Sequence, residues 1–236
     1  FKLESIYQKP SQLANEKKLY TVLAGGCGIP EMKWYGKEID YNILVMDYLG
    51  KSLEELFKEN GRVFSLKCVL IIAIQLISRL EYIHRKGFLH RDVKPENFII
   101  GEGKNSNIIY MIDYGISSRY INPKTQKHIE YREGKNVSGT ARYASINNHL
   151  GIEPSRRDDL ESLAYILIYF LKGSLPWQSM QGKTKKEKYD SIMKKKMATK
   201  SEDLCTGIPR EFKYFLDEVR KLNFTDTPHY SLYRRI

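Results

Sequence analysis

The sequence predicts an α+β fold in which a small strand-rich segment precedes a larger helical one. Residues 1–49 contain short apolar runs typical of strands, around one charged helical segment at 11–24. From residue 50 onward, apolar residues recur at three- and four-residue steps, which indicates helices. The chain of 236 residues is long enough to bury one sizeable core. We therefore expect 1–236 to be a single domain.

The composition indicates a globular, basic protein. Lys and Arg number 39 against 28 Asp and Glu, which gives a formal charge of +11. A content of 42% hydrophobic and 12% aromatic residues excludes a chain that is disordered throughout. The positive charge suggests nucleic acid, an anionic membrane surface, or acidic and phosphorylated proteins as partners, and composition does not choose among them.

Targeting signals and cysteine usage point to the inside of the cell. The longest apolar stretch, Leu163–Leu171, falls short of the roughly 18 residues that cross a bilayer. The N-terminus shows no secretion signal. The three cysteines, at 27, 68 and 205, fit neither a disulfide framework nor a zinc site. We expect an intracellular protein, in the cytoplasm, the nucleus or both, that is a monomer.

The first elements can be read in chain order. The compact apolar run Ile43–Met46 predicts a buried strand that ends at a turn over Asp47–Gly50. Apolar residues on one face predict a long helix over 66–85. Gly87 stands just past its end, where a left-handed cap residue is expected.

Three further helices follow. The segment 158–172 is apolar on nearly all sides from Leu160 onward, as in a helix inside a core. Its acidic first turn suits the positive end of the helix dipole. The segments 183–196 and 209–222 predict two more helices, the first strongly basic on its exposed side.

A polar segment between the first two long helices carries unusual residues. The run His90–Asn97, H-R-D-V-K-P-E-N, lies between two short apolar steps at 88–89 and 98–100. A third apolar run, 108–112, leads into Asp113-Tyr114-Gly115. Three short strands are therefore expected to bring two aspartates and one asparagine to neighbouring loops.

These side chains suit metal-assisted phosphoryl transfer. Mg²⁺ prefers hard oxygen ligands, of which Asn97 and Asp113 offer two. Asp92 is then left to orient and deprotonate a hydroxyl group. The pattern H-R-D-x-x-x-x-N followed by D-x-G is the protein-kinase catalytic-loop and metal-loop signature. A single loop aspartate is usually a turn former, but the order and spacing here favour the kinase interpretation. We assign His90 a structural role and Arg91 that of a tether for the loop.

Beyond this signature, the chain resembles the casein kinase I family of serine/threonine protein kinases, from Lys2 to its end. The stretches Gly139–Asn147, Ser155–Ser162 and Gly173–Gln178 carry the resemblance. Most kinases have Ala-Pro-Glu in the first stretch, whereas this family has Ser-Ile-Asn, as at 145–147. The resemblance implies a two-lobed kinase fold, with a partial N-lobe and hinge over 1–49 and a C-lobe over 50–236.

The resemblance also implies site residues. Asp92 matches the catalytic base, and Lys94 matches the lysine that contacts the transferring phosphate. Asn97 and Asp113 match the metal ligands, so ATP and Mg²⁺ are the implied cofactors. The implied nucleotide site consists of the phosphate-holding Lys2, its helix partner Glu16, the gatekeeper Met46, the hinge residues Asp47 and Leu49, and Ile99 under the purine.

Substrates of this family are acidic or already phosphorylated upstream of the target hydroxyl. Arg142 and Lys188 match its phosphate-binding pocket, where a guanidinium takes two phosphate oxygens and a lysine adds a point charge. A second basic cluster is partly kept, with Arg91 and Lys135 matching and Ser118 in place of a lysine. Specific nucleic-acid binding is disfavoured because no interleaving of aromatic and basic residues is present.

Departures from the family pattern leave an alternative open. Two parts of the family pattern are absent from the 236 residues: the glycine loop that joins the first two strands, and the last helices at the C-terminus. We therefore expect a truncated chain. Gly25–Gly28 does not replace the loop, because it follows a helix. The expected function is transfer of the γ-phosphoryl group of MgATP to Ser or Thr; the alternative is a weakly active, kinase-like scaffold that binds acidic partners. Tyr114 replaces the usual Phe, and its hydroxyl needs a partner if it is buried.

Overall fold

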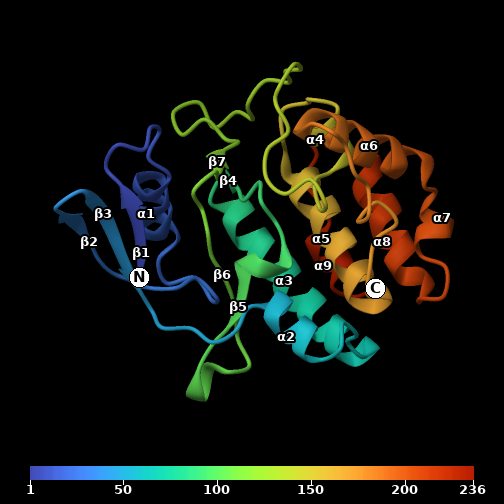
Figure 1. Cartoon of the computed structure of the whole chain (residues 1–236), viewed down its shortest axis with the longest axis horizontal. Coiled ribbons are helices and arrows are strands. Elements are labelled where there is room, and N and C mark those ends of the chain that lie inside the picture. Colours follow the sequence, from blue (N-terminus) through green and yellow to red (C-terminus); the bar gives the residue numbers. More distant parts are fainter.

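A three-stranded antiparallel sheet and one helix form the N-terminal part of the structure (Figure 1). In this computed structural model, which describes residues 1–236, the strand order is β1-β3-β2. The bounds are β1 Lys2–Ser5, β2 Met32–Glu38 and β3 Tyr41–Met46. Helix α1, Gln12–Leu23, begins at Ser11, whose hydroxyl accepts the N–H of Ala14. The predicted helix over 11–24 and the strand at 43–46 are confirmed.

The middle of the chain contains one long helix and four short strands. Helix α2, Leu53–Glu59, is followed by α3, Leu66–Arg85, with the bounds that the apolar periodicity predicts. The strands pair as β4 with β7 and β5 with β6. Their bounds are β4 Phe88–Leu89, β5 Phe98–Ile100, β6 Ile109–Met111 and β7 Ser118–Arg119, with 3-10 turns at Pro95–Asn97 and Gly103–Asn105. The three short strands predicted around the polar segment are therefore present.

Helices make up the rest of the chain, with bounds α4 Ile146–His149, α5 Arg156–Lys172, α6 Lys185–Ala198, α7 Ser201–Leu204, α8 Arg210–Lys221 and α9 Tyr230–Tyr233. The helix predicted at 158–172 begins two residues earlier than predicted, and the helix predicted at 183–196 is shifted two residues later at both ends. Contacts at the helix starts explain the difference. The N–H of Ser155 donates to the carboxylate of Asp158 in the first, and Thr184 and Glu187 form a capping box in the second.

Helix α5 lies at the centre of the core, where every residue from Leu160 to Phe170 is buried. Helices α3 and α8 pack against it. Its first-turn acids do more than face the helix dipole, because Asp158, Asp159 and Glu161 are themselves buried and accept hydrogen bonds. Buried carboxylates need such partners.

The mixed content of helices and strands agrees with the predicted α+β class. The proposed boundary at Asp47–Gly50 lies in the segment between β3 and α2, and the division into two lobes stays a prediction. None of the helices combines the length and the apolar character that crossing a membrane requires. The three cysteines are free thiols.

Candidate active site

Asp92 lies in the loop between β4 and β5 and is held at both carboxylate oxygens. Oδ1 accepts the N–H and the hydroxyl of Thr140, each at 2.8 Å, and Oδ2 lies 2.5 Å from Nζ of Lys94. The side-chain amide of Asn97 donates to the Asp92 carbonyl at 2.9 Å. The structure therefore brings together three residues that the sequence predicted for the site. Thr140, which ties the loop to the segment before α4, was not predicted.

The backbone of this loop rests on Asp159, a buried residue of α5. Its Oδ1 accepts the N–H of Arg91 and its Oδ2 accepts the N–H of His90, both at 2.8 Å. Burial alone would raise the pKa of Asp159, but the hydrogen bond and charge of His84 and the backbone donors outweigh burial and lower it. Arg91 has φ of 70°, a left-handed backbone conformation that these bonds hold in place. Asp159 is thus a supporting residue that sequence reasoning missed.

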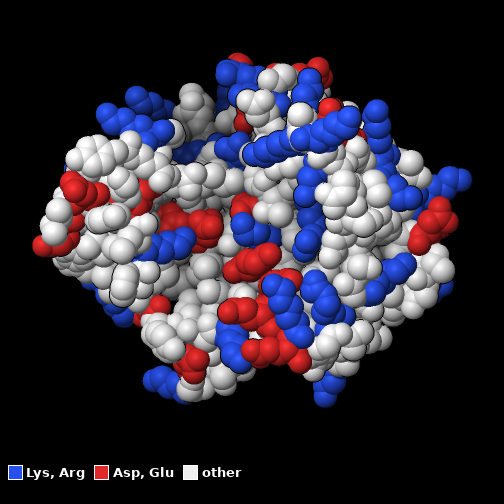
Figure 2. Space-filling model, in the orientation of Figure 1, with Lys and Arg blue, Asp and Glu red and all other residues white.

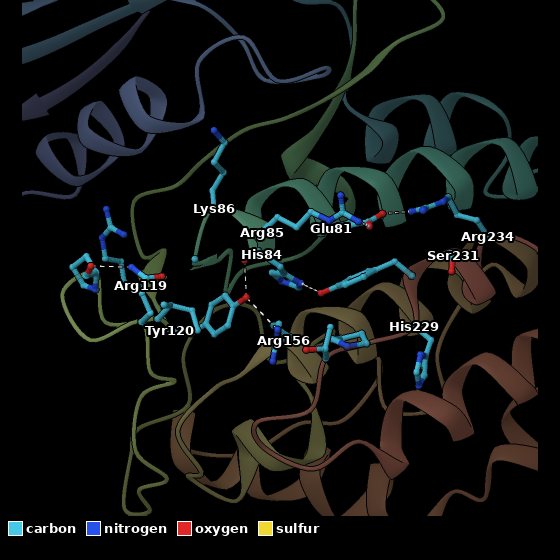
Figure 3. Close-up of a pocket in the computed structure, with 17 residues that line it drawn as sticks. Glu81, His84, Arg85, Lys86, Arg119, Tyr120, Arg156, His229, Ser231 and Arg234 are labelled. Carbon is cyan, nitrogen blue, oxygen red and sulfur yellow. Dashed lines mark hydrogen bonds and ion pairs between the residues drawn. The ribbon is translucent and has the colours of Figure 1, made fainter.

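His84 connects Asp159 to a cavity that His84 itself helps to line. Figure 3 shows this cavity. Its Nε2 donates to Asp159 at 2.8 Å, and its Nδ1 accepts the hydroxyl of Tyr230 at 2.7 Å. The hydroxyl of Tyr120 donates to the His84 carbonyl at 2.6 Å. The cavity, of about 550 Å³, is bordered by these residues and by Arg156. Helix α9 therefore stabilises the catalytic loop through two intermediates.

His90 links the catalytic loop to the metal loop. It is 0% exposed, and its Nε2 donates to the carbonyl of Ile112 at 2.9 Å. Its Nδ1 accepts the N–H of Asp92 at 3.3 Å. Both ring nitrogens serve the backbone, so the structural role predicted for His90 is confirmed. Arg91 shows no such tether, because its guanidinium forms no hydrogen bond and its Nε is buried without a partner.

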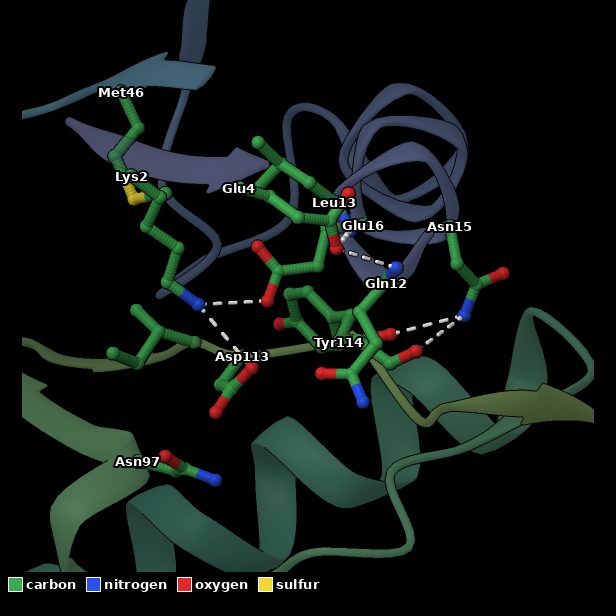
Figure 4. A network of polar contacts seen from close by, with 12 residues as sticks. Lys2, Glu4, Gln12, Leu13, Asn15, Glu16, Met46, Asn97, Asp113 and Tyr114 are labelled. Carbon is green, nitrogen blue, oxygen red and sulfur yellow. Dashed lines mark hydrogen bonds and ion pairs between the residues drawn. The ribbon is translucent and has the colours of Figure 1, made fainter. Parts of the chain in front are cut away.

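Lys2, Glu16 and Asp113 form a charged cluster where α1 meets the metal loop (Figure 4). Nζ of Lys2 lies 2.7 Å from Oε1 of Glu16 and 3.2 Å from Oδ1 of Asp113. The predicted contact between Lys2 and Glu16 is therefore present. Burial opposes the charge of Lys2, but the two carboxylates outweigh it and raise its pKa.

The two carboxyl groups of this cluster titrate far apart. Burial and the neighbouring Asp113 raise the pKa of Glu16 to about 7. Burial also disfavours the charge of Asp113, but its contact with Glu16 and the ammonium of Lys2 outweigh burial and lower its pKa to about 2. Oε2 of Glu16 is buried without a hydrogen-bond partner. The negative charge of the cluster is thus concentrated on Asp113.

Asn97 and Asp113 have the atoms that a divalent cation needs. The amide nitrogen of Asn97 is used toward Asp92, which leaves its Oδ1 without a protein partner. Oδ2 of Asp113 also has no protein partner. In the view of Figure 4, Asp113 lies between Lys2 and Asn97. Two hard oxygens with free lone pairs fit Mg²⁺.

The predicted hinge residues leave backbone groups free at one edge. The carboxylate of Asp47 accepts the N–H of Glu31 at 2.8 Å, and the backbone N–H of Asp47 donates to the Glu31 carbonyl at 3.0 Å. The carbonyl of Asp47 and both backbone groups of Leu49 form no hydrogen bond within the protein. These groups fit the donor and acceptor edge of a purine. Met46 accepts the hydroxyl of Tyr20 through its sulfur at 3.9 Å, and Ile99 is half-buried on β5.

Arg142 and Lys188, which the resemblance implies as ligands of a substrate phosphate, line one cavity of about 590 Å³. Arg142 is half-buried and Lys188 is exposed, and neither forms an ion pair with a carboxylate. Thr140, which binds Asp92, borders the same cavity. Lys and Arg side chains gather on this face of the molecule, over the region where Figure 1 labels α4 and α6 (Figure 2). A positively charged cavity therefore lies beside the predicted base.

The second basic cluster is only partly assembled. Arg91, Ser118 and Arg119 line a separate cavity of about 530 Å³. Lys135 instead forms an ion pair with Glu153 at 2.8 Å. Its charge is therefore compensated within the protein.

The family assignment rests on a match that extends over nearly the whole chain. The family model of the protein kinase domain matches residues 2–228. This range includes Lys2, the catalytic loop, the metal loop and the charged cavity. The chain therefore belongs to the protein kinase family.

Proposed function

We propose that this kinase is a serine/threonine kinase of the casein kinase I type, which phosphorylates hydroxyls that follow acidic or already phosphorylated residues. Membership of the family makes it a transferase that binds ATP, and protein kinases use Mg²⁺ with ATP. Our proposal adds three points to this: that the target residue is Ser or Thr, that the substrates are acidic or already phosphorylated, and that the kinase is of the casein kinase I type. We place the protein inside the cell, in line with its free cysteines.

The chain's own residues can hold each reactant in this reaction. Asp113 and Asn97 would hold Mg²⁺ through their free oxygens, and Lys2, positioned by Glu16, would hold nucleotide phosphates. MgATP supplies the γ-phosphoryl group. Asp92 orients the substrate hydroxyl and takes its proton as the new bond from oxygen to phosphorus forms and the bond to the β-phosphate oxygen breaks. Lys94, 2.5 Å from Asp92, offers positive charge beside the transferred group.

The observation that carries the substrate class is the cavity that Thr140 shares with the site of Asp92. The charged residues of its lining are four cations and one acid: Arg142, Lys183, Lys185, Lys188 and Glu96. Thr140, also in the lining, donates its hydroxyl to the carboxylate of Asp92. A phosphate carries close to two negative charges at neutral pH and forms strong, charge-assisted hydrogen bonds with a guanidinium. A substrate with a phosphate upstream of its target hydroxyl could reach both the cavity and Asp92.

Arg142→Ala tests this assignment. We expect kcat/KM of the full-length protein to fall at least tenfold on a peptide with a phosphoserine upstream of the target. A tenfold drop corresponds to about 1.4 kcal/mol of transition-state binding. The loss on the matched unphosphorylated acidic peptide should be below threefold. Arg210→Ala is the control, because the Arg210 side chain is 94% exposed and does not belong to the cavity lining.

The same assay addresses the scaffold alternative. Asp92→Asn should abolish turnover while ATP binding persists, because the base is lost and the shape is kept. Retention of most of the wild-type turnover would show that the base is assigned wrongly. Binding of acidic proteins without turnover in the wild type would favour the scaffold. Equal losses on both peptides for Arg142→Ala would make Arg142 a structural residue of its loop.

A further inference from the structure

Lys196 is a buried lysine that the proposed reaction does not use. It lies near the end of α6 and is 1% exposed. Its Nζ donates to the carbonyls of Ala141 at 2.9 Å and Ala144 at 2.5 Å. Nζ also lies 4.9 Å from the ring centre of Tyr165 and 5.2 Å from that of Trp177. A buried ammonium in an aromatic site needs such directed contacts, because desolvation is costly.

The two carbonyls that Lys196 binds lie on either side of Arg142 in the chain. Between them, the indole N–H of Trp177 donates to the carbonyl of Arg142 itself at 2.7 Å. Trp177 is 1% exposed, so its ring cannot move away without opening the core. Three of the four carbonyls from Ala141 to Ala144 are thus bound by buried side chains, and Nε2 of His149 lies 3.2 Å from the Ala141 carbonyl as a further contact. The guanidinium of Arg142 is free of carboxylate partners.

Helix α6 also carries Lys188, the other cation of the cavity. Lys188 and Lys196 are eight residues apart, which is roughly 12 Å along a helix. Lys196 therefore links α6, which carries Lys188, to the loop that carries Arg142. This connection is one of the contacts that set the separation between Arg142 and Lys188, which both line the cavity.

We propose that Lys196 and Trp177 form a clamp that positions Arg142 relative to Lys188, and that this clamp sets the preference for a phosphorylated substrate segment. The inference rests on the proposed function, in which Arg142 and Lys188 bind the substrate phosphate. Both residues act through Arg142 and are positioning residues. A purely structural role would lower stability and affect all substrates alike, whereas a clamp affects one class of substrate.

The test compares Lys196→Met with Lys195→Met. Both remove one amine from adjacent positions of α6, but Lys195 is exposed. Methionine keeps the length of the apolar stem against Trp177 and Tyr165. For Lys196→Met we expect the ratio of kcat/KM on the phosphorylated peptide to that on the unphosphorylated peptide to fall about tenfold. Lys195→Met should keep the ratio within twofold of the wild type.

A double-mutant cycle with Arg142→Ala shows whether Lys196 acts through Arg142. In the Arg142→Ala background, Lys196→Met should cause no further change in the ratio, since the group that it positions is gone. Trp177→Phe keeps most of the packing and removes one hydrogen bond, so it should lower the ratio three- to fivefold. If Lys196→Met does not fold, the ratio measured for Trp177→Phe tests the clamp in its place.

Each outcome has one meaning. A wild-type protein with no preference for the phosphorylated peptide, or an Arg142→Ala variant that keeps it, would overturn the assignment of Arg142 to the substrate phosphate, on which the clamp rests. A wild type whose preference depends on Arg142 but survives both Lys196→Met and Trp177→Phe would overturn the clamp alone. A further fall of the ratio in the double variant would show that Lys196 does not act through Arg142, and the clamp would again be wrong.

Discussion

Replacing Asp159 with asparagine should loosen the catalytic loop by a predictable amount. The carboxylate accepts three hydrogen bonds of 2.8 Å, from the backbone of His90 and Arg91 and from Nε2 of His84. Asparagine keeps one accepting oxygen, and its amide nitrogen faces at least one N–H donor. Hydrogen bonds to a charged group contribute roughly 1.5–3 kcal/mol each. With one such bond lost and one buried donor unpaired, the free energy of unfolding should fall by about 2–4 kcal/mol.

For a chain of 236 residues the unfolding entropy is about 0.5 kcal/mol per kelvin. The loss in Asp159→Asn then corresponds to a decrease of roughly 4–8 °C in Tm. Differential scanning calorimetry would measure this decrease, with Asp203→Asn as the control because Asp203 is exposed. Turnover should fall about tenfold, since the backbone that positions Asp92 is no longer held. A Tm within about 1 °C of the wild type, with unchanged turnover, would refute the supporting role of Asp159.

Two further predictions concern buried charges near the site. Above pH 7, Glu16→Gln should raise KM for ATP about tenfold, because the ammonium of Lys2 then faces a neutral amide in place of the carboxylate at 2.7 Å; an unchanged KM would contradict this. Below pH 7 Glu16 itself carries a proton, because its pKa is raised to about 7, so the amide resembles it and Tm should change by less than about 2 °C. Burial lowers the pKa of Lys196 to about 7, in surroundings that include Glu161, Arg220 and His149, whereas the unfolded chain keeps 10.5. Between pH 7 and 10 the unfolded state therefore binds more protons than the folded state, so the stability of the wild type should rise with pH. Denaturation at several pH values should show the free energy of unfolding of the wild type rising, relative to that of Lys196→Met, by about 1 kcal/mol per pH unit. A difference that stays constant with pH would exclude this titration.

The elements that the sequence predicts well are those with a local signal. The helix over 66–85 was found to the residue, because one apolar face and a glycine just past its end mark it clearly. The catalytic and metal loops were found because short apolar strands flank them. The short helices α4, α7 and α9 were missed, since four residues do not show a period. Helix α2 had a usable signal in the capping box of Ser52 and Glu55.

The supporting residues of the site could not be found in the same way. Asp159 and the loop that it holds are 68 residues apart, and Lys196 and Ala141 are 55 residues apart. In the run Lys194-Lys195-Lys196 the first two side chains are exposed and the third is buried, although their chemistry is identical. The one local sign was the spacing of four from Ile192, which places Lys196 on the buried face of α6. Packing at long range decides which charge becomes structural.

The tyrosine of the metal loop would bias that loop toward the conformation that the structure shows. Tyr114 is 0% exposed, and its hydroxyl donates to the carbonyl of Met111 at 2.9 Å. Its ring packs edge-on against Tyr20, with 5.0 Å between the ring centres. A loop that swung outward would lose this hydrogen bond, whose net contribution to stability is about 1 kcal/mol. That free energy corresponds to a roughly fivefold shift in population toward the inward state. A phenylalanine would lack that bias, so the hydroxyl favours an inward-facing Asp113 between turnovers, and inhibitors that select an outward loop would lose about fivefold in affinity.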